Sequence, residues 1–394
     1  MKIGIFTDTY FPQVSGVATS IKTLKEELLA QGHEVYIFTT SDPLVKKEDR
    51  VIRFASIPLL SFKERRIAVS GLGASVKQAR ELELDMIHTQ TEFGMGWLGK
   101  RTARKLGIPV IHTYHTMYED YLHYIVDGKL LKPKHVRWLS RKFTKGMNGI
   151  VCPSQRVVDK LQEYDIQLPM EIIPTGINLK QLSQTTDDSH DLLREHYQVA
   201  ADDILLLSLS RLSFEKNIQA TVAAMPEIIA TLPKTKLMIV GSGPYADDLK
   251  QQVADLDLTD HVIFTGEVNN QLVGEFYRAA DLFVNTSTSE SQGLTYIEAL
   301  AAGAKVVAPN GPYLAGLIDD PSLGRLFDNV EEFGSVVCQY LAELSTNADL
   351  SKEEIRQTKL ADISSQRFVE KVSAFYQVAE ANYQKEVVAT RQKA

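Results

Sequence analysis

The sequence contains little cysteine and no long hydrophobic run. Its 394 residues include only two cysteines, Cys152 and Cys338, which excludes a disulfide-stabilised scaffold and fits a reducing compartment. No stretch approaches the ~18 apolar residues of a membrane-spanning helix. The first residues, Met-Lys-Ile-Gly-Ile-Phe, lack the apolar core of a signal peptide. We therefore expect a folded protein that does not cross a membrane, with ordinary contents of hydrophobic (44%) and charged (24%) residues.

The sequence also lacks an overall positive charge, but its charge is unevenly distributed. The formal net charge is -7. Residues 1–175 contain 25 Lys and Arg against 19 Asp and Glu, whereas residues 176–394 contain 18 against 31. A basic half joined to an acidic half favours contact of the first half with an anionic surface, although chance can also produce such a split. No nucleic-acid partner is expected.

Short apolar segments alternate with longer amphipathic ones along the whole chain. This alternation predicts strands joined by helices, and hence parallel sheets covered on both faces. We expect an α/β fold of two doubly wound, Rossmann-like sheets facing a cleft. The predicted domains are 1–175, joined by a final helix at 370–394, and 176–369. The predicted strands are Ile3–Thr7, Val35–Thr39, Met86–Thr89, Val110–Tyr114, Gly149–Cys152, Ile172–Pro174, Ile204–Ser208, Lys236–Val240, Val262–Thr265, Leu282–Asn285 and Lys305–Ala308.

Two glutamates with seven residues between them give the strongest chemical signal. Glu290 follows a predicted strand, and a helix is expected to start near 291–293 and to carry Glu298. The backbone N–H groups of Gly293 and Leu294 would then lie at the positive end of a helix dipole, which favours a phosphate. Glu298 can accept hydrogen bonds from a diol such as ribose. The spacing alone is weak, because Glu290 can also cap the helix and Glu298 can be a solvated surface residue.

Two further loops follow predicted strands of the second half. Arg211 and Lys216 come after the strand that begins at Ile204, and both can hold a diphosphate, although surface cations are common. Gly243 follows the next strand and permits close approach of the backbone to a ligand, or simply makes a turn. Because ligands bind beyond the carboxyl ends of parallel strands, all three residues are candidate ligand-binding residues.

The first half offers two candidates at the corresponding ends of its strands. Gly16 opens the helix after the first strand, where a phosphate can lie, but the dinucleotide fingerprint G-x-G-x-x-G is absent. His115 follows the strand that begins at Val110 and can donate to a substrate hydroxyl or to a developing charge. A packed or surface histidine is the alternative for His115.

No metal site is predicted. Asp255-Leu256-Asp257 matches an Asp-x-Asp pattern, but it precedes a strand and so lies at the wrong end of the sheet. His112 and His115 are three positions apart, which places them on opposite sides of a strand. We expect no metal and no cofactor.

The segment 129–145 contains seven cations and no acid. In the helix that Pro133 is expected to start, Val136, Leu139, Phe143 and Met147 form an apolar face. The opposite face includes a tryptophan among basic residues, which favours an anionic membrane surface over a solvated helix face. The loop Pro58–Arg66 mixes apolar and basic residues and can extend that surface. The predicted membrane residues are Lys134, Arg137, Trp138, Arg141, Lys142 and Lys145.

These motifs together resemble the retaining family 4 nucleotide-sugar glycosyltransferases, which have two Rossmann-like domains (the GT-B type). The resemblance covers nearly the whole chain, from the first loop through Pro174–Gly176 to the final helix. It implies that Glu298 binds the ribose and that Glu290 binds hydroxyls of the donor sugar. It also implies that His115 contacts the sugar near the reacting carbon, so Glu290 and His115 are the candidate catalytic residues. The donor-site residues it implies are Gly16, Arg211, Lys216, Gly243, Glu290, Gly293, Leu294 and Glu298.

Within this family the chain looks most like the Gram-positive 1,2-diacylglycerol 3-glucosyltransferases. The stretches 7–17, 111–116 and 287–296 carry that likeness. It implies UDP-glucose as the donor, diacylglycerol as the acceptor and a peripheral position on the cytoplasmic face of the membrane. One departure is Ser15 before Gly16, where many members have Gly-Gly. The alternatives are a transferase of the same fold with a soluble or polymer acceptor, and a nucleotide-sugar epimerase or binding protein.

Overall fold

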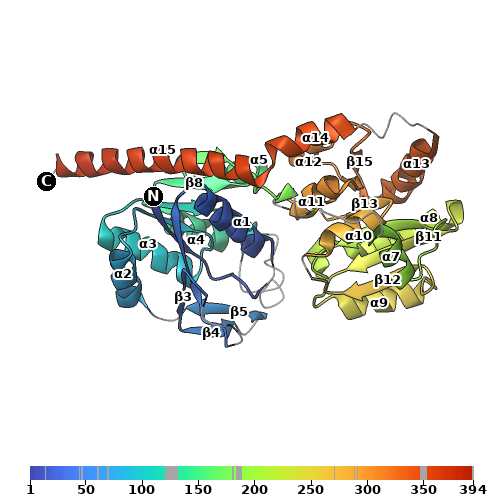
Figure 1. Cartoon of the computed structure of the whole chain (residues 1–394), viewed down its shortest axis with the longest axis horizontal. Coiled ribbons are helices and arrows are strands. Elements are labelled where there is room, and N and C mark those ends of the chain that lie inside the picture. The colour runs from blue at the N-terminus through green and yellow to red at the C-terminus, as the bar shows by residue number, and fades with distance from the viewer. Residues whose placement is uncertain are drawn as a thin grey trace. The chain divides into compact units, whose positions relative to one another are not determined.

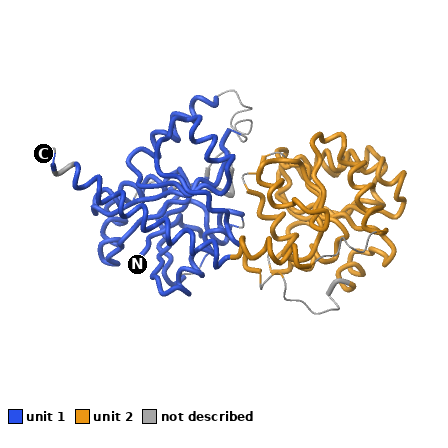
Figure 2. Tube along the Cα trace, turned by 90° about the horizontal axis from the view of Figure 1, so that it is seen from above, with its two compact units in different colours: residues 1–176, 365–394 blue, residues 177–364 orange. Residues whose placement is uncertain are grey.

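The computed structural model describes the chain apart from residues 14, 44, 46–47, 60–61, 69–70, 120–131, 180–181, 183–188, 270, 288, 291, 347–352 and 393–394. The chain forms two compact units, coloured separately in Figure 2. Unit 1 contains Met1–Gly176 and Ser365–Ala394, and unit 2 contains Ile177–Ser364. The predicted α/β class with two Rossmann-like sheets is confirmed.

Unit 1 is built on a parallel sheet with the order β3-β2-β1-β6-β7-β8-β9 (Figure 1). Its strands are β1 Lys2–Phe6, β2 Glu34–Thr40, β3 Val51–Phe54, β6 Met86–Thr89, β7 Val110–Thr113, β8 Gly149–Cys152 and β9 Met170–Ile172. Its helices are α1 Gly16–Ala30, α2 Leu72–Glu81, α3 Gly94–Leu106, α4 Pro133–Thr144, α5 Gln155–Glu163 and α15 Ser365–Arg391.

Helices cover both faces of this sheet. On one face α1 and the terminal helix α15 pack together over apolar residues such as Ile5 and Ile111. On the other face α3 and α4 cover residues such as Phe6 and Ile87. Gly149 of β8 lets α15 approach, because a Cβ there would lie 2.6 Å from the ring of Phe375. The terminal helix therefore belongs to the core of unit 1, and the boundary between the units falls at Ser365 rather than at 370.

The segment that was predicted as a loop, Pro58–Arg66, contributes to strands instead. β4 (Ser56–Leu59) and β5 (Phe62–Ala68) form an antiparallel pair, and residues 60 and 61 between them lie outside the described part of the chain. The prediction failed because Lys63–Arg66 is a run of four charged residues, and the pairing of this segment with β4 is not visible in local composition.

Unit 2 is a second parallel sheet, with the order β12-β11-β10-β13-β14-β15. Its strands are β10 Ile204–Leu209, β11 Thr235–Val240, β12 Val262–Gly266, β13 Leu282–Val284, β14 Lys305–Pro309 and β15 Gly324–Phe327. Its helices are α7 Ser189–His196, α8 Ile218–Thr231, α9 Ala246–Asp255, α10 Val273–Ala279, α11 Leu294–Ala302, α12 Pro312–Leu317, α13 Phe333–Thr346 and α14 Glu353–Asp362, with short 3-10 helices η3 Phe214–Lys216 and η4 Val330–Glu332. Since β10 and β13 are neighbours, the loops that follow them emerge side by side.

Candidate active site

The two strongest sequence signals of unit 2 form a single cluster. The loop after β10 carries Lys216, and the loop after β13 carries Glu290. The Nζ of Lys216 donates to Oε1 of Glu290 at 2.6 Å, and both side chains are partly buried. Asn217 and Thr286 tie the same two loops together through two further hydrogen bonds, of 3.1 and 2.6 Å. A cation and a carboxylate are thus held together at the carboxyl edge of the sheet.

Gly243 lies against the loop that follows β10. A Cβ at Gly243 would come within 2.1 Å of the carbonyl oxygen of Leu212, and one at Gly241 within 1.9 Å of that of Ser210. The N–H of Leu212 also donates to the carbonyl of Ser242 at 2.9 Å. The glycines therefore bring the loop after β11 against the loop that carries Arg211, whose side chain is exposed.

Helix α11 begins later than predicted. Its first residue is Leu294, and Gly293 precedes it with φ +76°, a left-handed conformation that glycine adopts without strain. A side chain at Gly293 would also collide with the ring of Tyr296, at 2.4 Å. Ser291 lies outside the described residues. The first turn of α11, whose N–H groups have no helical partners, thus follows Glu290 closely.

Glu298 lies in the second turn of α11, with its carboxyl group packed into the unit. Burial raises the pKa of Glu298, and a hydrogen bond from Tyr277 of α10 opposes that rise. The hydroxyl of Tyr277 donates to Oε2 of Glu298 at 3.1 Å. Tyr277 was missed in the sequence analysis, because nothing in the order of residues connects it with Glu298.

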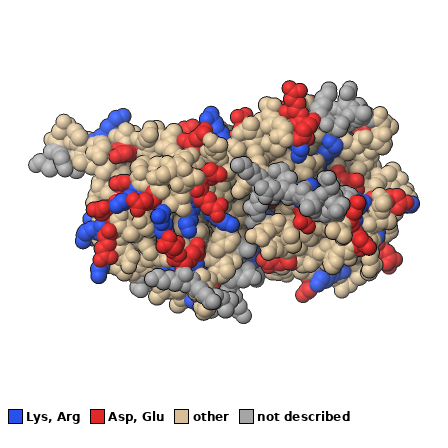
Figure 3. Space-filling model, in the orientation of Figure 1, with Lys and Arg blue, Asp and Glu red and all other residues tan. Residues whose placement is uncertain are grey.

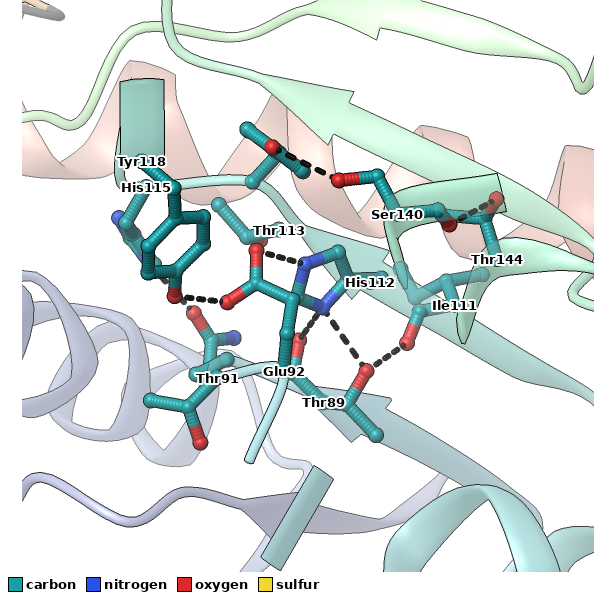
Figure 4. A network of polar contacts seen from close by, with 12 residues as sticks. Thr89, Thr91, Glu92, Ile111, His112, Thr113, His115, Tyr118, Ser140 and Thr144 are labelled. Atoms are coloured by element: carbon teal, nitrogen blue, oxygen red, sulfur yellow. Dashed lines mark hydrogen bonds and ion pairs between the residues drawn. The ribbon is translucent and has the colours of Figure 1, made fainter. Parts of the chain in front are cut away.

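Unit 1 contains a second polar cluster, at the carboxyl ends of β6 and β7 (Figure 4). His112 lies between two partners: Nε2 is 3.0 Å from Oε1 of Glu92, and Nδ1 is 3.0 Å from the carbonyl of Thr89. The hydroxyl of Tyr118 donates to the other oxygen of Glu92. Both nitrogens of His112 are therefore engaged by protein groups rather than presented to a metal.

His115 lies beside this cluster and is held by Gln90. Its Nε2 is 2.7 Å from Oε1 of Gln90, so Nε2 carries the proton and donates it to the amide oxygen. Burial, followed by the nearby His112, lowers the pKa of His115 to about 3. The imidazole is thus a neutral hydrogen-bonding group at physiological pH and not a cation. Gln90 and Glu92 directly follow strand β6, a position that could have singled them out.

Asp8 organises the same edge of unit 1. Its carboxylate accepts from the hydroxyl of Thr91 at 2.7 Å and from the N–H of Met95, near the start of α3, at 3.0 Å. Burial raises the pKa of Asp8 to about 6, and these hydrogen bonds oppose the rise. Like Asp8, Gly16 follows strand β1, and it is the first residue of α1. The hydroxyl of Ser15 caps that helix by accepting from the N–H of Ala18 at 3.2 Å.

A pH experiment tests the neutral state of His115. With a folded pKa of about 3, well below the ordinary value of 6.5, the side chain stays uncharged as the pH falls from 8 to 5. His115→Ala, which removes the neutral hydrogen-bonding ring, is expected to lower kcat/KM by roughly fivefold, the value of one neutral hydrogen bond. The ratio of wild-type to variant kcat/KM should stay constant from pH 8 to 5. A ratio that changes steeply around pH 6.5 would show that His115 titrates normally.

A basic and aromatic surface lies on α4. The six predicted membrane residues, Lys134 to Lys145, are exposed, and Trp138 is 60% exposed with the Nζ of Lys142 4.6 Å from its ring centroid. Val136, Phe143 and Met147 are buried as predicted, but Leu139 is 38% exposed, so its assignment to the buried face was wrong. Lys129 lies outside the described residues.

This surface is less uniformly basic than the segment 129–145 suggests. Asp165, which follows α5, accepts from Arg137 and from Arg141, the latter at 3.4 Å. On the face of the molecule shown in Figure 3, Lys and Arg are likewise interspersed with Asp and Glu. The positive charge that this surface offers to an anionic partner therefore depends on the cations without an acidic neighbour, and less on the total number of cations in the segment.

Helix α3 adds cations and the other tryptophan of the chain. Trp97 has Lys100 at 5.1 Å and Arg101 at 5.9 Å from its ring centroid. A groove of about 530 Å³ lies between α3 and α4, lined in part by Trp97, Arg101, Leu139 and Lys142. We call the following residues the basic-aromatic patch: the half-buried Trp97 and exposed Arg101 of α3, with the exposed Lys134, Arg137, Trp138, Arg141, Lys142 and Lys145. The charge run in the sequence indicates only the α4 half of this patch.

Within the described ranges, no three His, Cys, Asp or Glu side chains are grouped so as to hold a metal ion. Asp255 ends α9 and precedes β12, at the amino end of that strand, as predicted. Over the same ranges, no helix has the length and apolar character that a membrane span needs.

Two family models match the chain. The model described as Glycosyltransferase Family 4 matches residues 14–181, and the model described as Glycosyl transferases group 1 matches residues 189–357. The alpha-monoglucosyldiacylglycerol synthase of Streptococcus pneumoniae (strain ATCC BAA-255 / R6) is 45% identical over 98% of this chain and 88% of its own. The protein of the same name from Acholeplasma laidlawii is 34% identical, over 89% and 92%.

Solved structures share the fold. The crystal structure of Anabaena Alr3699/HepE in complex with UDP-glucose superposes with a TM-score of 0.77, covering 96% of this chain and 99% of that one. The sequence identity is 16%, so this likeness concerns the architecture alone.

Proposed function

We propose, from the premise that this chain belongs to the family 4 glycosyltransferases of GT-B type, that it transfers glucose from UDP-glucose to diacylglycerol. The product would be α-monoglucosyldiacylglycerol, formed with retention of configuration. The names of the two relatives that are 45% and 34% identical support this acceptor. Within the structure, the observation that carries the proposal is the contact between Lys216 and Glu290.

The arrangement in unit 2 suits the departure of a diphosphate. The bond between the anomeric carbon and the diphosphate oxygen breaks, and a bond from that carbon to the acceptor oxygen forms on the same face. The acceptor proton passes to the leaving diphosphate. Lys216, Arg211 and the first turn of α11 would stabilise the charge that builds up on the diphosphate. Glu290, fixed by Lys216, would accept hydrogen bonds from hydroxyls of the sugar.

The basic-aromatic patch supports action at a membrane surface. An exposed tryptophan, Trp138, and a half-buried one, Trp97, both with neighbouring cations, favour the interface of an anionic membrane. In this proposal the protein is peripheral, on the cytoplasmic face, and needs neither a metal nor a cofactor. Its partners are a UDP-sugar, diacylglycerol and anionic lipid.

A product assay tests the proposal. Purified protein is incubated with UDP-glucose and vesicles that contain diacylglycerol, with and without anionic lipid. The expected product is a glucosyl lipid with an α-anomeric NMR signal, formed faster on anionic vesicles. UDP-galactose in a parallel reaction shows which sugar is preferred. Glucosylation of soluble sugars or polyols but never of diacylglycerol would contradict the proposal and indicate a soluble or polymer acceptor. Conversion of UDP-glucose alone into another nucleotide sugar would indicate an epimerase.

A further inference from the structure

Unit 2 contains two buried tyrosines close to Glu298, one in contact with it and one two positions before it in α11. Tyr277 of α10 and Tyr296 of α11 are both fully buried. Each contacts the ring of Phe283 of β13 edge-on, with centroid distances of 5.3 and 5.9 Å. Both rings therefore share Phe283 as an aromatic neighbour.

The two tyrosines differ in their hydroxyl groups. The hydroxyl of Tyr277 donates to Oε2 of Glu298 at 3.1 Å, whereas that of Tyr296 is buried with no hydrogen-bond partner among the described residues. Removing the first hydroxyl deletes a charge-assisted hydrogen bond, and removing the second deletes none. The chain thus provides a matched pair in which only one member acts on Glu298.

The hydrogen bond has two effects on the carboxyl group. It fixes one oxygen, so the direction of the other, Oε1, is also fixed. It favours the ionised form as well, and so opposes the burial that raises the pKa of Glu298. A carboxyl group that accepts hydrogen bonds from a diol needs both a fixed direction and a negative charge. The negative charge of Glu290 also raises the pKa of both Tyr277 and Tyr296. Replacing either tyrosine by phenylalanine leaves the ion pair between Glu290 and Lys216 in place.

We propose that Tyr277 is a positioning residue for nucleotide binding, which holds the Glu298 carboxylate in the direction that accepts the ribose hydroxyls of the donor. This inference rests on the proposed function, because it assumes that Glu298 binds the ribose. Tyr277 touches no substrate in this scheme and acts only through Glu298.

Calorimetric titration with UDP tests the inference. Tyr277→Phe is expected to raise the Kd for UDP roughly tenfold, whereas Tyr296→Phe should change it less than about twofold. At saturating UDP-glucose, kcat of Tyr277→Phe should stay near the wild-type value while KM rises. The loss should grow as the pH falls from 8 to 5, because Glu298 without its hydrogen bond takes up a proton at higher pH. Tyr296→Phe should follow the wild-type pH profile.

A modified ligand separates positioning from packing. With 2′,3′-dideoxy-UDP, which has no ribose hydroxyls, wild type and Tyr277→Phe should bind equally. Equal losses in the two tyrosine variants, or a loss that persists with the dideoxy ligand, would overturn the inference in favour of simple packing. The affinity of the Glu298→Gln variant for UDP is measured in the same way. If Glu298→Gln lowers the affinity for UDP while Tyr277→Phe does not, the positioning role of Tyr277 is wrong and the ribose role of Glu298 stands. If Glu298→Gln binds UDP as wild type does, the ribose role of Glu298 and this inference are both wrong, while the product assay still decides the proposed reaction.

Discussion

Replacing Lys216 by alanine is expected to lower kcat/KM for UDP-glucose on the order of 100-fold to 1,000-fold. Lys216 is held at 2.6 Å from Glu290, so the ammonium group is already in place before the donor binds. A preorganised charge that faces developing negative charge has an effect of this size when it is removed. The measurement is the initial rate of glucosyl transfer as a function of UDP-glucose concentration.

A matched control separates this effect from the general loss of an ion pair. Lys359 pairs with Asp319 in the same unit, also at 2.6 Å, and Lys359→Ala should leave kcat/KM nearly unchanged. Glu290→Gln and the double variant complete a cycle with Lys216→Ala. We expect the double variant to lose much less than the product of the single losses, because each partner positions the other. Equal activity in Lys216→Ala and Lys359→Ala would rule out the assigned role of Lys216.

The sequence predicted those parts of the fold where apolar residues cluster. Strands such as β10, with Ile-Leu-Leu-Leu at its start, are buried on both faces and stand out from the helices around them. The strands β3 and β15 were not predicted. Each has four residues and includes an arginine, Arg53 or Arg325, so neither shows an uninterrupted apolar run. They join the sheets by pairing with β2 and β14, and such pairing cannot be read from local composition.

The site was predictable where a motif is contiguous and not where contacts join distant segments. The two glutamates and the two cations were found as separate motifs, and the structure joins them through Lys216 and Glu290, 74 positions apart. Tyr277 and Gln90 act through single hydrogen bonds to Glu298 and His115, and their own neighbours in sequence give no sign of this. Gly243 was found for its residue type, but its close neighbour is the backbone of Leu212.

Neutralising four cations of the basic-aromatic patch is expected to weaken binding to anionic vesicles by about 1,000-fold. The variant replaces Arg101, Lys134, Lys142 and Lys145 with glutamine. In the part of the chain that the structure describes, none of these four forms an ion pair with an acid, unlike Arg137 and Arg141, which share Asp165. Each cation near an anionic membrane contributes about 1 kcal/mol, and four together contribute about 4 kcal/mol. Sedimentation with vesicles of increasing anionic lipid content measures the partition coefficient.

The control variant changes the net charge equally but elsewhere. Lys22, Lys77, Lys234 and Lys250 each lie near an acid and outside α3 and α4, and their replacement by glutamine should alter vesicle binding little. The difference between the two variants should shrink at high salt, because exposed charges are screened.

Since the chain has only two tryptophans, Trp97→Phe and Trp138→Phe leave single fluorescent reporters, one on each helix. The emission maximum of each single-tryptophan variant is expected to shift to shorter wavelength on anionic vesicles, because contact of both α3 and α4 with the membrane removes water from both indole rings. Equal weakening by the two quadruple variants would mean that net charge, and not this patch, governs membrane binding.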